Sequence, residues 1–101
     1  MSALWTIDAM APAMKARRSG VLPAGVNGIS IDSRTAGKGA AFFAIRGENR
    51  DGHEFVESAL KAGAGLAVVS SAQSARFPDA PLLIVPDVFE ALRDLARAAR
   101  P

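Results

Sequence analysis

The chain has 101 residues, of which 50% are hydrophobic and 22% charged, which favours one soluble globular domain and excludes a largely disordered chain. Its 12 Lys and Arg residues against 10 Asp and Glu leave a net charge of only +2, which is weak support for a nucleic-acid-binding protein. The sequence has no cysteine, no signal-peptide pattern and no apolar run of the roughly 20 residues that a membrane span needs, so we expect a cytoplasmic protein without nucleic-acid or membrane partners.

The first third of the chain predicts a helix, a turn region and a short strand. Residues 6–18, TIDAMAPAMKARR, are amphipathic and have Thr6 as a candidate N-cap, but Pro12 should kink or shorten this helix. Residues 19–28, SGVLPAGVNG, are dense in glycine and proline and predict turns, and ISID at 29–32 predicts a short strand.

The middle of the chain predicts a buried strand and then a capped helix. After the turn SRTAGKG, the apolar run AAFFAI at 40–45 is typical of a strand that is buried on both faces. A helix is expected to begin at Asp51, which forms a capping box with Glu54, and to end where Gly63 can adopt a left-handed conformation. The apolar stripe of this helix comprises Phe55, Val56, Ala59, Leu60 and Ala62.

The last third predicts two buried strands and a final helix. LAVVS at 66–70 and LLIVP at 82–86 are the strands, and Asp87 with Glu90 repeats the capping arrangement before the helix. The residues expected on the buried face of this helix are Val88, Leu92, Leu95, Ala96 and Ala99. Strands that alternate with helices predict an α/β fold, with a small mostly parallel or mixed sheet flanked by helices.

The end of the sequence bears on domain organisation. The predicted helix continues to Arg100 and the chain stops at Pro101, without the glycine that commonly closes a helix. We therefore expect residues 1–101 to be one domain that is cut from a longer protein.

Glycine-rich nucleotide motifs are incomplete in this chain. A P-loop needs two glycines around four residues, followed by lysine and a hydroxyl residue, whereas Lys38 is followed by Gly39 and position 32 is an aspartate. The stretches GKGAAF and GAGLAV both lack the third glycine of a dinucleotide fingerprint. No ATP site, and no cofactor, is expected within the chain.

Polar residues gather around the predicted strands at 29–32 and 40–45, in a pattern that suits an anionic ligand. If these strands are neighbours, the polar residues meet at one edge of the sheet, where guanidinium groups can bind phosphate and amide or hydroxyl groups can bind a base or sugar. The alternative is that the arginines form ordinary surface ion pairs with Asp32, Glu48 and Asp51. The residues that would form this edge are Ser33, Arg34, Arg46, Asn49, Arg50 and the stretch from Asp51 to His53.

Catalytic and metal-binding roles find little support in the same segment. His53 is the only histidine, and without a second histidine or a cysteine a metal site would need several carboxylates. A nucleophilic role for Ser33 would need a general base held within reach, which the sequence does not identify. We therefore predict no catalytic residue and no metal site.

The string DSRTAGKGAAFFAIRGENRDGHEFVESALKAGAGLAVV, residues 32–69, resembles the N-terminal domain of the Mur ligases, ATP-dependent amide ligases of peptidoglycan synthesis. Asp-Ser-Arg at a strand end, a strand with phenylalanine, a glycine, Asp-Gly-His and a helix before Gly-Ala follow the family's order. The resemblance covers residues 28–100, and Pro12 departs from the family's usual opening. It is closest to the type that adds D-alanyl-D-alanine (MurF type), and the type that adds the third stem-peptide residue (MurE type) is its nearest competitor.

The resemblance implies a function in cell wall biogenesis, and through it in cell shape and cell division. The domain would bind the uridine diphosphate (UDP) end of UDP-N-acetylmuramoyl-tripeptide, to which the parent ligase joins D-alanyl-D-alanine. The ATP and Mg²⁺ sites would lie in a central domain outside this chain, so the chain alone would be catalytically inactive. A stand-alone nucleotide-binding or interaction module is the alternative from another class.

Carried over residue by residue, the resemblance also implies a binding site for the UDP moiety. Ser33 and the backbone of Ile31 would contact the uridine. The loop residues that would line the same site are Gly47, Glu48, Asn49 and Arg50. The residues that would support this loop or reach the ligand are Arg34, Arg46, Asp51 and His53.

Overall fold

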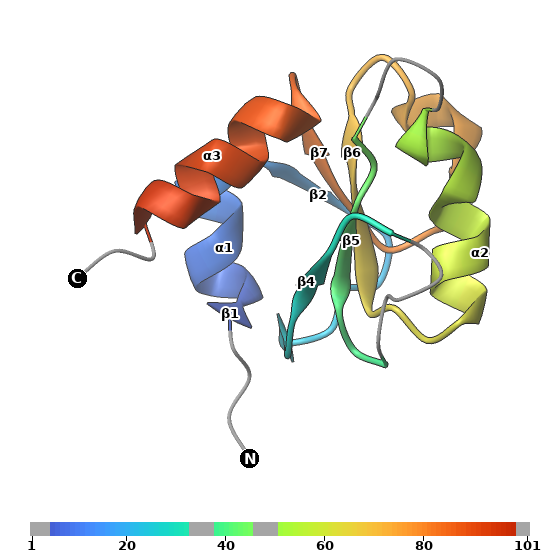
Figure 1. Ribbon diagram of the computed structural model, residues 1–101, viewed down its shortest axis with the longest axis horizontal. Coiled ribbons are helices and arrows are strands. Elements are labelled where there is room, and N and C mark those ends of the chain that lie inside the picture. Colours follow the sequence, from blue (N-terminus) through green and yellow to red (C-terminus); the bar gives the residue numbers. More distant parts are fainter. Residues whose placement is uncertain (1–4, 33–37, 46–50, 99–101) are drawn as a thin grey trace.

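A five-stranded sheet forms the centre of the molecule in the computed structural model, which describes residues 5–32, 38–45 and 51–98 (Figure 1). The strand order is β2-β7-β6-β5-β4; β4 to β7 are parallel to one another, and β2 is antiparallel to β7. The predicted mostly parallel or mixed sheet is therefore confirmed. Its strands are β2 (Arg17–Ser19), β4 (Ile29–Ser30), β5 (Ala41–Phe43), β6 (Leu66–Ser70) and β7 (Leu82–Val85).

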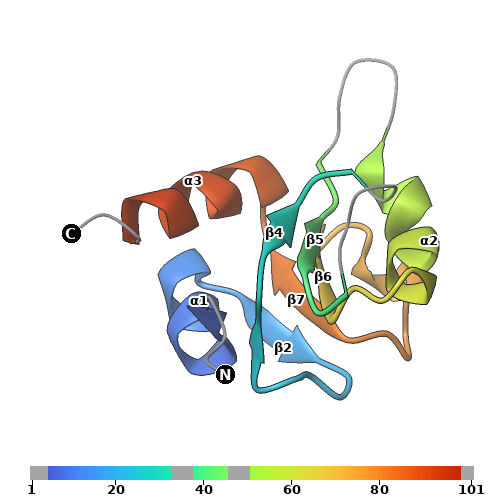
Figure 2. The ribbon, with the colours of Figure 1, turned by 60° about the horizontal axis from the view of Figure 1, so that its bottom comes forward.

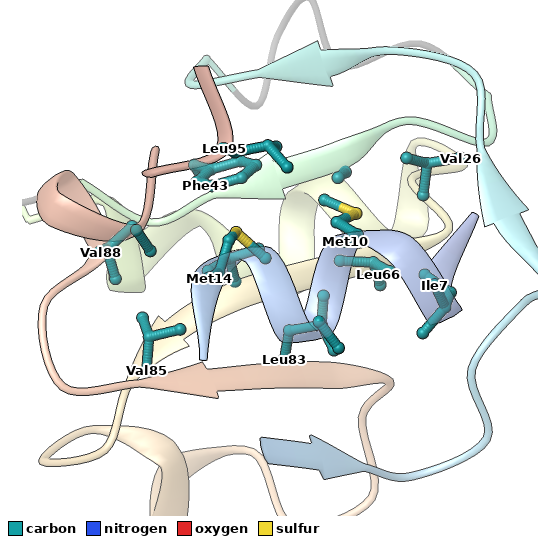
Figure 3. Close-up of a cluster of buried hydrophobic side chains, with 14 residues drawn as sticks. Ile7, Met10, Met14, Val26, Phe43, Leu66, Leu83, Val85, Val88 and Leu95 are labelled. Carbon is teal, nitrogen blue, oxygen red and sulfur yellow. The ribbon is translucent and has the colours of Figure 1, made fainter. Parts of the chain in front are cut away.

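Helices cover both faces of this sheet (Figures 1 and 2). The helices α1 (Ile7–Met14) and α3 (Val88–Ala98) pack on one face, and α2 (Val56–Lys61) packs on the other. Because side chains alternate along a strand, Phe43 points into the cluster under α1 and α3, whereas Phe42 points into the cluster under α2. Figure 3 shows the first of these clusters. The run AAFFAI is apolar throughout because each face of β5 is buried.

Helix α1 is shorter than the predicted helix at 6–18. Thr6 caps it by accepting a hydrogen bond from the N–H of Ala9 at 3.2 Å, as predicted. The helix ends two residues after Pro12, where Lys15 adopts a left-handed conformation with a φ of 56°. The N–H of Lys15 bonds Pro12 O and that of Ala16 bonds Ala11 O, which is a Schellman motif with lysine in the place of glycine. The expected shortening is confirmed, and a helix beyond Met14 was wrong.

Two small elements complete the first third of the chain. The strands β1 (Trp5–Thr6) and β3 (Gly25–Val26) pair antiparallel in a separate two-stranded sheet. Residues 19–28 were predicted as turns only, so β3 is an addition to that prediction. Among the described residues, no helix has the length and apolar character that crossing a membrane requires.

The predicted helix at Asp51 is confirmed, but it begins as a 3₁₀ turn, the side chain of Asp51 caps His53 and not Glu54, and Ala62 of the expected apolar stripe is exposed. Asp51 accepts a hydrogen bond from the N–H of His53, and the 3₁₀ helix η1 (Gly52–Phe55) leads directly into α2. Gly63 ends the helix with a φ of 115°, as expected for a residue that needs a positive φ. A second 3₁₀ helix, η2 (Ser74–Arg76), lies in the loop between β6 and β7.

Helix α3 begins at the predicted cap. Asp87 Oδ1 accepts a hydrogen bond from the N–H of Glu90 at 2.9 Å. Of its expected buried face, Val88 and Leu95 are buried and Leu92 is partly buried, but Ala96 is exposed and Ala99 lies outside the described residues. Ala91 is buried instead, because the helix presents the row 88, 91, 95 to the sheet.

Replacing Asp87 with alanine is expected to lower the free energy of unfolding by about 1 kcal/mol, because the N–H of Glu90 loses its acceptor. Urea denaturation of both proteins measures this difference. The matched control is Asp79→Ala, at an exposed aspartate whose carboxylate bonds no other described residue, and it should stay within about 0.5 kcal/mol of the unsubstituted chain. Equal losses in the two variants would contradict the capping role.

Candidate functional site

A pocket of about 300 Å³ lies where β5, β6 and β7 end. Ala44 and Ile45, which follow β5, form one wall. Ser70 is the last residue of β6, Gln73 follows it, and Phe89 lies in the first turn of α3. Asp51 and His53 also line the pocket. In open α/β sheets, ligands bind in the crevice beyond the carboxyl ends of the parallel strands, so this is the edge where a site is expected.

Asp51 and His53 are joined by hydrogen bonds at the wall of the pocket. His53 is 4% exposed, its Nδ1 lies 2.6 Å from Asp51 Oδ1, and the N–H of Ser70 donates to its Nε2 at 3.0 Å. Because a backbone N–H can only donate, Nε2 is unprotonated, and the neutral ring carries its proton on Nδ1, which donates to Asp51. Both ring nitrogens are therefore engaged within the protein.

Gly52 lies against the backbone at the end of β5. Its N–H donates to the carbonyl oxygen of Ile45 at 2.9 Å. A Cβ atom at position 52 would come within 2.7 Å of the nitrogen of Ile45 and 2.8 Å of its oxygen, so no larger residue fits without moving this backbone. The Asp-Gly-His motif thus consists of an aspartate that caps the helix, a glycine in close contact with the end of β5 and a histidine that is hydrogen-bonded to β6.

The described residues of the pocket wall carry carboxylate, aromatic and neutral polar groups. Two aspartates, Asp51 and Asp87, line the pocket, and no lysine or arginine of the described residues does. Phe89 is 54% exposed beside them and offers an aromatic face, while Ser70 and Gln73 offer hydroxyl and amide groups. Groups of these kinds can contact a base or a sugar.

Three of the predicted site residues can be placed. Ile31 follows β4 at the same edge of the sheet and is 60% exposed, while Asp51 and His53 line the pocket. The structure does not bring Ile31 to the pocket wall. The predicted residues that lie outside the described ranges are Ser33, Arg34, Arg46, Gly47, Glu48, Asn49 and Arg50.

Sequence reasoning missed the part of the pocket that β6 and β7 supply. Ser70, Gln73 and Phe89 were not predicted as site residues. Their position after two predicted parallel strands was the available signal, because all such strands end at the same edge. Within residues 5–32, 38–45 and 51–98, no group of three or more His, Cys, Asp or Glu side chains could hold a metal ion.

Comparison with protein families and curated proteins gives consistent matches. The model for the "Mur ligase family, catalytic domain" matches residues 25–100. A UDP-N-acetylmuramoyl-L-alanyl-D-glutamate--2,6-diaminopimelate ligase of Chlorobaculum tepidum is 37% identical over 73 residues, which are 72% of this chain and 14% of that enzyme. The enzyme of the same name from Chlorobium phaeobacteroides is 40% identical over 88 residues, or 85% of this chain and 17% of that enzyme.

Solved structures share the fold. A crystal structure of MurF from Acinetobacter baumannii superposes with a TM-score of 0.82 at 28% identity, covering 93% of this chain and 20% of that one. A second structure from this organism, of the UDP-N-acetylmuramoylalanyl-D-glutamyl-2,6-diaminopimelate--D-alanyl-D-alanyl ligase, gives a TM-score of 0.81. The fold predicted from the resemblance is confirmed, and the chain spans only 14% to 21% of the length of the relatives and structures named above.

Proposed function

Because this chain belongs to the Mur ligase family, we propose that it binds the UDP end of UDP-N-acetylmuramoyl-tripeptide for ATP-dependent ligation of D-alanyl-D-alanine in peptidoglycan synthesis. The observation that carries the proposal is the pocket at the carboxyl edge of β5, β6 and β7, lined by Asp51 and His53 of the family-like Asp-Gly-His motif. Residues 1–101 act as the nucleotide-binding domain of a longer cytoplasmic ligase.

The proposed role in the reaction is to position the substrate. In the parent ligase, the peptide carboxylate takes the terminal phosphoryl group of ATP to form an acyl phosphate and ADP. The amine of D-alanyl-D-alanine then attacks the acyl phosphate, which forms the amide and releases inorganic phosphate. Binding at the remote nucleotide end holds the carboxylate at the reaction centre, and so lowers the entropic part of the barrier. The chain has no P-loop, so other parts of the parent protein supply the ATP and Mg²⁺ sites.

We propose that the two ends of UDP bind in different places. The uridine suits the neutral and aromatic groups of the pocket, such as Gln73 and Phe89. The diphosphate requires cations, and Arg34, Arg46 and Arg50 of the two predicted binding segments are the arginines for that task. Arginine forks match phosphate oxygens better than lysine does.

The MurE type is the second candidate, since the curated relatives described above carry the name of a diaminopimelate-adding ligase. The solved structures favour the MurF type. The full-length parent protein decides between them when it is assayed with UDP-N-acetylmuramoyl dipeptide and diaminopimelate, and separately with the tripeptide and D-alanyl-D-alanine. If the parent protein turns over the dipeptide with diaminopimelate and does not turn over the tripeptide with D-alanyl-D-alanine, the MurF assignment is overturned.

Titrating the ¹⁵N-labelled chain with UDP-N-acetylmuramoyl-tripeptide tests the proposal directly. We expect amide shifts at Ser70, Gln73 and Phe89, with about millimolar affinity because the contacts of other domains are missing. Ser33→Ala and Asn49→Ala should weaken the response. We expect no phosphate release from ATP, measured with the same protein.

Three other outcomes would contradict parts of this proposal. Tight binding by the isolated chain would favour a stand-alone nucleotide-binding module. No response to any uridine nucleotide would favour an interaction domain. Appreciable ATP turnover by the pure chain would show that catalysis resides within these 101 residues.

A further inference from the structure

The contacts of residues 51–53 join two neighbouring strand ends. Gly52 is bonded to the carbonyl oxygen of Ile45, just beyond β5, at 2.9 Å. His53 accepts a hydrogen bond from the N–H of Ser70, the last residue of β6, at 3.0 Å. Asp51 accepts hydrogen bonds from both the backbone and the ring of His53, at 3.0 and 2.6 Å. We call this set of contacts the His53 bridge.

The His53 bridge lies in the wall of the pocket. The bridge ties together Ile45, Asp51 and Ser70, and all three line the pocket. The ring of His53 is 4% exposed, and no buried side-chain nitrogen or oxygen of the described residues lacks a hydrogen-bond partner. The bridge therefore fixes the distance between two walls of the pocket without leaving a ring nitrogen free for a ligand.

A purely space-filling role does not account for this arrangement. Burying a polar ring is unfavourable unless its hydrogen bonds are made, and an apolar side chain would fill the same volume without that requirement. The two nitrogens instead reach groups on different segments, Asp51 before η1 and Ser70 at the end of β6. Groups that orient the residues in contact with a ligand act in this way at many binding sites.

From this geometry, and resting on the proposed function, we infer that His53 is a positioning residue for nucleotide binding. It does not contact the nucleotide through its ring nitrogens. It holds Asp51 and Ser70 at the spacing that the uridine end of the substrate requires. Loss of either hydrogen bond lets Asp51 and Ser70 move relative to each other, and binding weakens.

Two substitutions separate the two hydrogen bonds of the ring. In His53→Asn the side-chain amide can take the place of Nδ1 and bond Asp51, while the bond to Ser70 is lost. In His53→Gln the longer side chain can accept from Ser70, while the bond to Asp51 is lost. We expect each variant to bind UDP-N-acetylmuramoyl-tripeptide about fivefold more weakly, as for one lost hydrogen bond, and His53→Leu to lose more than either.

Binding is measured by ¹⁵N chemical-shift titration at a temperature where circular dichroism shows every variant folded. Met10→Ala is the control for general destabilisation, because Met10 is 0% exposed in the cluster under α1 and α3 and does not line the pocket. It should lower stability and leave the affinity unchanged. The ¹⁵N shifts of the ring should also show His53 protonated on Nδ1 and unprotonated on Nε2.

The results separate this inference from the proposed function. If the unsubstituted chain responds and the Asn and Gln variants bind as tightly as it does, the positioning role alone is overturned. An equal loss of affinity in Met10→Ala also overturns it, because stability would then explain the effect. If the unsubstituted chain itself does not respond, the proposed function fails and the positioning role fails with it.

Discussion

Replacing Phe43 with alanine is expected to lower the free energy of unfolding by about 3–5 kcal/mol. Phe43 is 0% exposed and lies on β5, an interior strand of the sheet, in the cluster that α1 and α3 cover (Figure 3). The substitution removes a ring from a close-packed interior and leaves a cavity that strands on both sides prevent from collapsing. Domains of this size are commonly stable by only about 5–15 kcal/mol, so much of the stability would be lost.

Urea or guanidinium denaturation measures this loss, and Phe89→Ala is the matched control. Phe89 is 54% exposed, so removing its ring should change the free energy of unfolding by less than about 1 kcal/mol. If Phe43→Ala does not fold, Phe43→Leu gives a smaller cavity and a measurable midpoint. A similar loss in the two alanine variants would show that Phe43 does not have the buried position described above.

The central elements of the fold could be predicted because their signals are local. Residues 40–44, 66–69 and 82–85 of the three apolar runs are buried, and a continuous apolar run is the pattern of strands that are covered on both faces. Asp51 and Asp87 were recognised as helix caps because the residue that accepts the hydrogen bond lies close in sequence to the N–H that donates it. These features need no knowledge of the rest of the chain.

The strand β2 could not be predicted, since its stability depends on a distant partner. Arg17 and Arg18 are exposed, and their polar character resembles the end of an amphipathic helix. They pair with Ile84 and Leu83 of β7, more than sixty residues away, and form the edge of the sheet. Charged residues are common on edge strands because they hinder unwanted pairing with other chains.

Of the described residues that line the pocket, only Asp51 and His53 had been named from the sequence as site residues. Placing Asp51 and His53 at the edge of the sheet required only strand order and motif position. The bond between His53 and Ser70 spans 17 residues, and no periodicity in the sequence indicates it. The same holds for Phe89, which reaches the pocket because α3 begins directly after β7 at that edge.

Gly52→Ala is expected to destabilise the protein by steric overlap at the candidate site itself. A Cβ atom at position 52 would lie 2.7 to 2.9 Å from three backbone atoms of Ala44 and Ile45, and backbone at the end of an interior strand cannot rotate away as a side chain can. We expect the free energy of unfolding to fall by about 3 kcal/mol. The bond from Gly52 to Ile45 would lengthen, and the His53 bridge would be displaced with it.

Gly28→Ala is the control that isolates this steric cause. A Cβ atom there has no neighbouring atom within 4 Å, and the φ of Gly28 is not positive, so the alanine should be neutral or stabilise the chain by up to about 1 kcal/mol. Urea denaturation measures the free energy of unfolding of both variants. We expect a large decrease for Gly52→Ala and no decrease for Gly28→Ala. If Gly52→Ala unfolds like Gly28→Ala, the close contact with β5 does not exist. The glycine of the Asp-Gly-His motif would then have no steric role. Its close contact with β5 would no longer explain why Asp51 and His53 lie in the pocket wall.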